Sequence, residues 1–251
     1  MTRAFEPTRP GNPINLTINQ HVLPKASIER FADSNGGRVQ LFDKIRSKSR
    51  LAKPNDQIFC AKRKWDHGSE AGYMCGIERR FQRLACQVIA GKVTSIGDSE
   101  KSIVDVFLAL WRARADQKTE EDREIKSSFV AGIELSKTRE ENLEKNGYIF
   151  VRKGGQLPSR MAHGIEIRMQ IRRWVHGLTD AQWGILQADQ GQFLVPDRPE
   201  RTMIPLTPTL CLCSGGQSGR ISGQNLAEIN RISKAVSVEY YFARDLGQCP
   251  G

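Results

Sequence analysis

The stretch GIERRFQRLACQVIA, residues 76–90, decides the fold class because it predicts an amphipathic helix in the interior of the chain. Its apolar side chains recur every three or four residues and so share one side of an α-helix: Ile77, Phe81, Leu84 and Val88. Arg79 and Arg83 fall on the opposite side, toward solvent. The chain therefore has at least one helix that must bury a face against other elements.

Further helices and strands extend this pattern in both directions. Helices are predicted after the capping residues Asp98 and Ser99, over 159–176 and over 224–234, and an acidic helix is expected over 119–146. Strands are predicted in VQLFDK (39–44), WGILQ (183–187), QFLVP (192–196), TLCLC (209–213) and SVEYYFAR (237–244). The second and third of these should form a hairpin. The sequence predicts an α+β fold, with central helices packed with a mainly antiparallel sheet built largely from the C-terminal half.

The ends of the sequence bear on domain organisation and location. Residues 1–14 contain three prolines and no periodicity, and we expect a flexible N-terminal arm there, followed by a single α+β domain over 15–251. The first residues lack the apolar core of a secretory signal. The longest apolar stretch, IVDVFLALW, is too short to span a bilayer. We therefore expect a cytoplasmic protein that has no membrane partner.

The charge of the chain favours polyanionic partners. The formal net charge is +10 and the isoelectric point is near 9.5. Residues 1–64 hold 13 Lys and Arg against 5 Asp and Glu, so much of the excess lies in the N-terminal quarter. Such a surface suits nucleic acid or an acidic protein, although many basic proteins bind neither. The candidate nucleic-acid-binding residues are Lys25, Arg30, Lys44, Arg46, Lys48 and Arg50.

The six cysteines do not spell out a metal motif. No Cys-x-x-Cys pair occurs, and Cys60, His67 and Cys75 are too loosely spaced for a standard zinc site. Cys211 and Cys213 lie two apart in a predicted strand and should point the same way. In a cytoplasmic protein we expect reduced, buried thiols.

Two motifs far apart in the chain resemble an uncharacterised bacterial family, domain of unknown function 4238. The first is QHVLPKASIERFA, in which His21, Pro24 and Phe31 match the opening signature of that family. The second is FLVPDRPERTMIPLTP, with the Asp-x-Pro of Asp197 and Pro199. The resemblance extends over about residues 19–243 and also matches Glu78 to a helical glutamate and Asn230 to a late asparagine. It implies no settled activity.

Three of the matched residues carry chemistry of their own. His21 precedes a predicted helix start, where it could act as a general acid or base on a phosphodiester, or could simply hold a loop by bonding a carbonyl. Asp197 follows a predicted strand. It could be a metal ligand, an orienting partner of His21, or a side chain that closes a turn after that strand. Glu78 flanks an apolar face, so it needs a partner, either a metal or an arginine such as Arg160 or Arg173.

The sequence leaves three functions open. His21, Glu78 and Asp197 could compose a catalytic site with a divalent metal such as Mg²⁺, which would make the protein a nuclease-like hydrolase, for instance in bacterial defence. The alternative is a non-enzymatic module that binds nucleic acid or protein. An enzyme acting on a small acidic substrate is the third. No nuclease signature, GxSxG motif, phosphate loop or dinucleotide fingerprint occurs.

Overall fold

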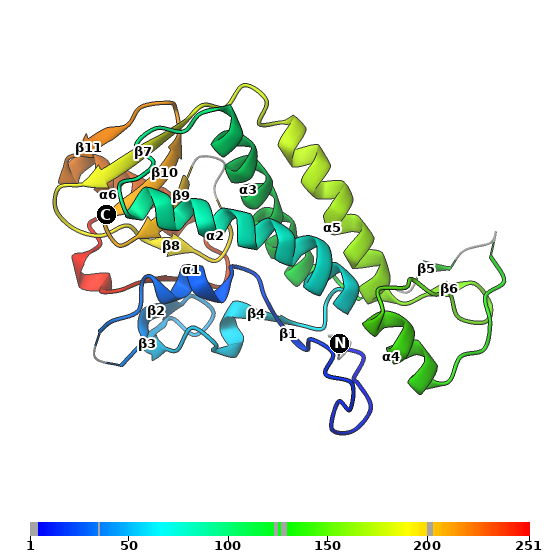
Figure 1. Cartoon of the computed structure of the whole chain (residues 1–251). Helices are drawn as coiled ribbons and strands as arrows, with labels where there is room; N and C mark the ends of the chain where they lie inside the picture. Colours follow the sequence, from blue (N-terminus) through cyan, green and yellow to red (C-terminus); the bar gives the residue numbers. More distant parts are fainter. Residues whose placement is uncertain (1–4, 35, 123–124, 127–129, 200–202) are drawn as a thin grey trace.

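The computed structural model describes residues 5–34, 36–122, 125–126, 130–199 and 203–251 (Figure 1). The chain is α+β, as predicted. Its helices are α1 (Lys25–Glu29), α2 (Cys75–Ile89), α3 (Asp98–Thr119), α4 (Lys137–Lys145), α5 (Ser159–His176) and α6 (Gly223–Val236), and a π-helical segment, Ser69–Met74, runs directly into α2. Within the described residues, no helix combines the length and apolar character needed to cross a membrane.

Two four-stranded sheets form the β part of the fold. The first has the order β11-β7-β10-β9 and lies wholly in the C-terminal half: β7 (Trp183–Ala188), β9 (Met203–Thr207), β10 (Leu210–Ser214) and β11 (Gly219–Ile221). The second has the order β3-β2-β12-β8 and joins both halves: β2 (Val39–Asp43), β3 (Lys48–Ala52), β8 (Val195–Pro196) and β12 (Tyr240–Ala243). All strand neighbours in these sheets are antiparallel except β11 and β7.

Two short ladders complete the strands. β1 (Asn19–His21) pairs with β4 (Cys60–Lys62), and β5 (Ile125–Lys126) pairs with β6 (Gln156–Leu157), both antiparallel. The β1–β4 ladder places His21 opposite Cys60 and so fixes the start of the first motif beside the 3₁₀ turn Gln57–Phe59.

The helical layer consists of α2, α3 and α5, with α3 between the other two (Figure 1). Phe81 of α2 stacks on Phe107 of α3, with ring centroids 3.5 Å apart and planes within 2°. One apolar cluster continues from these helices to the second sheet through Phe59, Tyr240 and Phe242. Burial of these large aromatic side chains supplies much of the driving force for packing the helices on the sheets.

Residues 5–14, expected as a flexible arm, are tied to α4 and α5 by ion pairs. The carboxylate of Glu6 lies 2.6 Å from a guanidinium nitrogen of Arg160 and 2.7 Å from one of Arg152. Arg9 pairs with the buried carboxylate of Glu141 at 2.8 Å. Proline content and lack of periodicity did not predict these contacts, because their partners lie more than a hundred residues away.

Most of the predicted helices and strands are confirmed. A strand expected in YIFVR (148–152) is wrong, because only Arg152 takes part in isolated bridges there, and a loop expected over 44–53 is wrong, because it contains β3. Two further predictions are also wrong. The predicted acidic helix over 119–146 is wrong, because α3 continues to Thr119, β5 follows and α4 covers only Lys137–Lys145. The predicted hairpin is also wrong. β7 pairs with β10 and β11, whereas β8, from the second arm of that hairpin, pairs with β12.

Candidate functional site

His21 has the structural role that was one of its two predicted alternatives. Its Nε2 lies 3.0 Å from the carbonyl oxygen of Pro54. Since a carbonyl can only accept, Nε2 carries the proton and donates a hydrogen bond to the carbonyl oxygen of Pro54. This bond fastens β1 to the loop that precedes the 3₁₀ turn. Nε2 of His21 is therefore engaged in a hydrogen bond within the protein.

Glu78 is one of two carboxylates that hold a buried arginine. The side chain of Arg114, only 1% exposed, donates to Glu78 through one terminal nitrogen and to Glu70 through the other, the latter at 2.8 Å. Burial opposes the charge of Arg114, but the two carboxylates outweigh it and raise its pKa. The ion pair expected for Glu78 is therefore present, with Arg114 rather than with Arg160 or Arg173.

Asp197 joins the end of β8 to the residues that precede β12. Its carboxylate accepts the backbone N–H of Val238 at 3.0 Å and that of Glu239 at 2.6 Å. Burial raises the pKa of Asp197, and the charge of Glu239 adds to the effect, while the backbone hydrogen bonds oppose it. The side chain thereby ties the end of β8 to the segment that enters β12, a long-range link rather than the local Asp-x-Pro turn predicted as one of its alternatives.

The contacts of His21, Glu78 and Asp197 do not join them into one site. Each has its own partners, and no hydrogen bond or ion pair joins any two of them in the described part of the chain. Nor do the described residues include a group of three or more His, Cys, Asp or Glu that could hold a metal ion. This donor set therefore does not fit the Mg²⁺-type centre that the sequence suggested, and we derive no chemistry through a metal.

Three of the six candidate nucleic-acid-binding residues are used inside the protein. Arg30 donates to the carbonyl of Leu206 at 2.7 Å, and burial lowers its pKa to about 10. The Nζ of Lys44 caps α6 by donating to the carbonyls of Lys234 and Ser237. Arg50 forms a two-pronged ion pair with Asp56 at 2.7 and 2.9 Å. The other three have exposed side chains: Lys25, Arg46 and Lys48.

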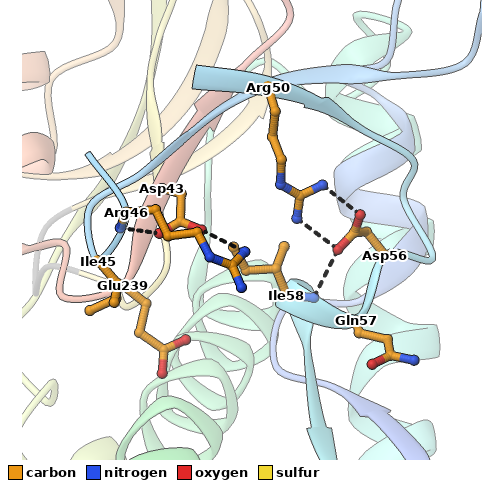
Figure 2. Close-up of a pocket in the computed structure, with 8 residues that line it drawn as sticks. All are labelled: Asp43, Ile45, Arg46, Arg50, Asp56, Gln57, Ile58 and Glu239. Carbon is orange, nitrogen blue, oxygen red and sulfur yellow. Dashed lines mark hydrogen bonds and ion pairs between the residues drawn. The ribbon is translucent and has the colours of Figure 1, made fainter. Parts of the chain in front are cut away.

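A pocket of about 430 Å³ lies beside the turn between β2 and β3 (Figure 2). Arg50 and Arg46 point into it, together with three carboxylates, Asp43, Asp56 and Glu239. Asp56 is held by Arg50, whose hydrogen bonds are the main cause of its lowered pKa. Because each arginine already faces a carboxylate, this pocket offers no net attraction for a polyanion.

A different surface carries arginines without acidic partners. α2 and α5 together contain seven arginines and two glutamates, and neither helix contains lysine or aspartate. Arg160 is buried in the N-terminal ion-pair network, but the other six are exposed: Arg79, Arg80, Arg83, Arg168, Arg172 and Arg173. None of these six has an ion pair within the described residues. We call these six residues the arginine face.

The two halves of the arginine face meet where α2 and α5 begin. Gly164 of α5 lies so close to the segment before α2 that an added Cβ would be 1.9 Å from an oxygen of Asp66 and 2.7 Å from the hydroxyl of Ser69. One turn later, the guanidinium of Arg168 lies over the ring of Tyr73, 5.3 Å from its centroid. From this junction the two helices diverge (Figure 1).

Helical phase shows which arginines of α2 lean toward α5. Gln82 accepts from Arg30, which follows α1, and so marks the flank of α2 on that side. Arg80 lies about 200° around the helix from Gln82, on the opposite flank. Tyr73 and Arg80 are seven residues apart, close to two helical turns, and therefore share this flank. The sequence placed Arg79 and Arg83 toward solvent, but the matching arginines of α5 could have been found by the same spacing argument.

Comparisons with known proteins add no further identification. No protein-family model, curated protein or solved structure matches the chain. The resemblance of its two motifs to domain of unknown function 4238 stays a prediction. Function must therefore be argued from the surface itself.

Proposed function

We propose that this protein binds nucleic acid without cleaving it, through the arginine face of α2 and α5. The supporting observation is the set of six exposed arginines on two helices that start close together, none of which is neutralised by a carboxylate of the described chain. Guanidinium groups pair with phosphate through two parallel hydrogen bonds, and their attraction adds along a repeating backbone.

The contacts of the predicted catalytic residues favour binding over hydrolysis. His21, Glu78 and Asp197 hold a carbonyl, a buried guanidinium and two backbone N–H groups, respectively. Joint catalysis would require the three side chains to meet at one substrate, and no hydrogen bond or ion pair of the described residues joins any two of them. The arginine face requires none of these three residues, so binding and hydrolysis can be tested separately.

Two triple variants of equal charge test the location of the surface. One replaces Arg80, Arg83 and Arg172 by Gln, and its matched control replaces the exposed residues Lys25, Arg46 and Lys48 by Gln. Affinity for labelled RNA and DNA is measured by fluorescence anisotropy over a range of salt concentrations. We expect the first variant to lower the salt dependence of log K by about 2, at about 0.7 per lost phosphate contact on a single strand. The control should stay close to wild type.

The outcomes separate the proposals. Equal losses in the two variants would mean that binding depends on net charge rather than on the arginine face. Binding to an acidic protein but not to nucleic acid would replace the proposed ligand. Incubation of the wild type with RNA or DNA and Mg²⁺ or Mn²⁺ should leave the strands intact. Cleavage that disappears in His21→Ala would support the hydrolase instead.

A further inference from the structure

Tyr73 brings an exposed aromatic ring into the arginine face. It lies in the π-helical segment Ser69–Met74, immediately before α2, and 39% of its surface is exposed. The guanidinium of Arg168 lies over the ring. Segments of π-helix inside α-helices are frequent at functional sites, because the extra residue re-aims the side chains that follow.

Apolar side chains are interleaved with the arginines of α5. Met169 is 57% exposed and Ile165 is also exposed, and both fall beside Arg168 and Arg172 at helical spacing. A duplex laid on this surface would present phosphates and sugars to Met169, which offers them no hydrogen bond, and would leave the ring of Tyr73 without a base to stack on. Unstacked bases would instead cover these side chains with apolar and π surface.

We infer that the ligand is single-stranded nucleic acid, with one base stacked on Tyr73 and the adjoining backbone contacting the arginines. This inference rests on the proposed function and names its ligand class. Arg80 lies about 10 Å along the helix from Tyr73 at 1.5 Å per residue, and Arg83 about 15 Å. Arg83 lies about 60° around the helix from Arg80, so a strand whose base stacks on Tyr73 would meet Arg80 on the same flank of α2 and then Arg83 nearer its solvent side. On the other side of the junction, Arg168 lies over the ring of Tyr73, and Arg172 is available to the same strand.

Three single variants test the stacking contact. Tyr73→Ala removes the ring, Tyr73→Phe keeps it without the hydroxyl, and Tyr148→Ala removes a tyrosine that is 63% exposed outside the arginine face. Affinity is measured for a short unstructured single strand and for the same strand annealed to its complement. Circular dichroism confirms that each variant is folded. We expect the single strand to bind wild type more tightly than the duplex does.

Tyr73→Ala should weaken single-strand binding by roughly 5- to 100-fold, the range of one base–aromatic stack, and leave duplex binding within about twofold. Tyr73→Phe and Tyr148→Ala should bind the single strand as wild type does. If Tyr73→Ala binds single strands like wild type, or if wild type prefers the duplex, the inference is overturned while salt-dependent binding through the arginines still stands. If no nucleic acid binds in a salt-dependent manner, the proposed function fails as well.

Discussion

Arg114 and Glu78 form an ion pair between α3 and α2 in which the guanidinium is buried and the carboxylate reaches the surface. The same guanidinium pairs with Glu70 and lies over the ring of Trp65. Glu78, which resembles a family marker residue, thus acts in this fold as half of the support for a buried charge. Its role can be tested through stability.

Replacing Arg114 by Met should lower the free energy of unfolding by about 3 kcal/mol, since removal of one partner of a buried ion pair leaves the others uncompensated. Glu78→Gln should cost only about 1 kcal/mol, because Glu70 still neutralises Arg114. Urea unfolding measures both. Arg79→Gln, on the solvent side of α2, is the control and should stay within about 0.5 kcal/mol of wild type. Equal costs for Arg114→Met and Arg79→Gln would contradict the structural role.

His21→Ala should destabilise the protein by about 1 kcal/mol and leave nucleic-acid affinity unchanged. The reason is that His21 loses one hydrogen bond to the carbonyl of Pro54 and contacts no residue of the arginine face. Chemical denaturation and anisotropy on the same preparation measure the two quantities. A loss of binding in a variant that is still fully folded would return His21 to the functional site.

The ion pairs of Glu6 should make stability depend on pH in the acid range. Burial opposes ionisation of Glu6, but the charge of Arg160 and the hydrogen bonds from Lys137 and Arg152 outweigh it and lower its pKa to about 2. A carboxyl whose pKa is lowered on folding contributes stability that is present above its ordinary value of 4.5 and is lost as the pH falls toward 2.

The comparison is therefore between wild type and Glu6→Gln across that window. Wild type should be the more stable at pH 7, and the difference should shrink steadily as the pH falls below 4.5 toward 2. Urea denaturation at each pH measures it. A difference that stays constant with pH would show that the pairs of Glu6 contribute nothing through its charge.

Gly164→Ala should be destabilising although alanine favours helices. An added Cβ would meet an oxygen of Asp66 at 1.9 Å and the hydroxyl of Ser69 at 2.7 Å, so α5 must shift away from the start of the π-helical segment. Such overpacking costs about 1–3 kcal/mol. Gly76→Ala, where a Cβ would meet nothing within 4 Å, is the matched control and should be neutral or stabilising. A neutral Gly164→Ala would refute the close approach.

Local sequence patterns predicted most helices and strands, but contacts between distant residues determine how the strands pair. The apolar spacing of Ile77 and Phe81 is a property of one segment, so helix α2 could be read directly. The partner of β8 could not, because β12 is far along the chain and no turn signal links the two. The acidic helix predicted to begin at Thr119 was overridden in the same way, since α3 ends at that residue.

The candidate site shows the same division. Residue type correctly identified His21, Glu78 and Asp197 as side chains that need partners, but the partners come from Pro54, Arg114 and the segment before β12. The charge count along the chain predicted a polyanion-binding surface in residues 1–64, but Arg30, Lys44 and Arg50 form hydrogen bonds or ion pairs within the protein. The arginine face depends on which side of each helix carries the arginines and on where the two helices lie relative to each other. The sequence predicts the first through helical spacing but not the second.

The order of the second sheet has a consequence for synthesis. β12 lies between β2 and β8, and its register joins Tyr240 to Asp43, so one edge of β2 stays open until Tyr240–Ala243 has been made. On the ribosome, β2 and β3 must wait for β12, with Phe59 and Phe31 lacking their ring contacts to Phe242. Chains that stop before Tyr240 would expose that strand edge and those rings together, a combination that promotes aggregation and recognition by chaperones.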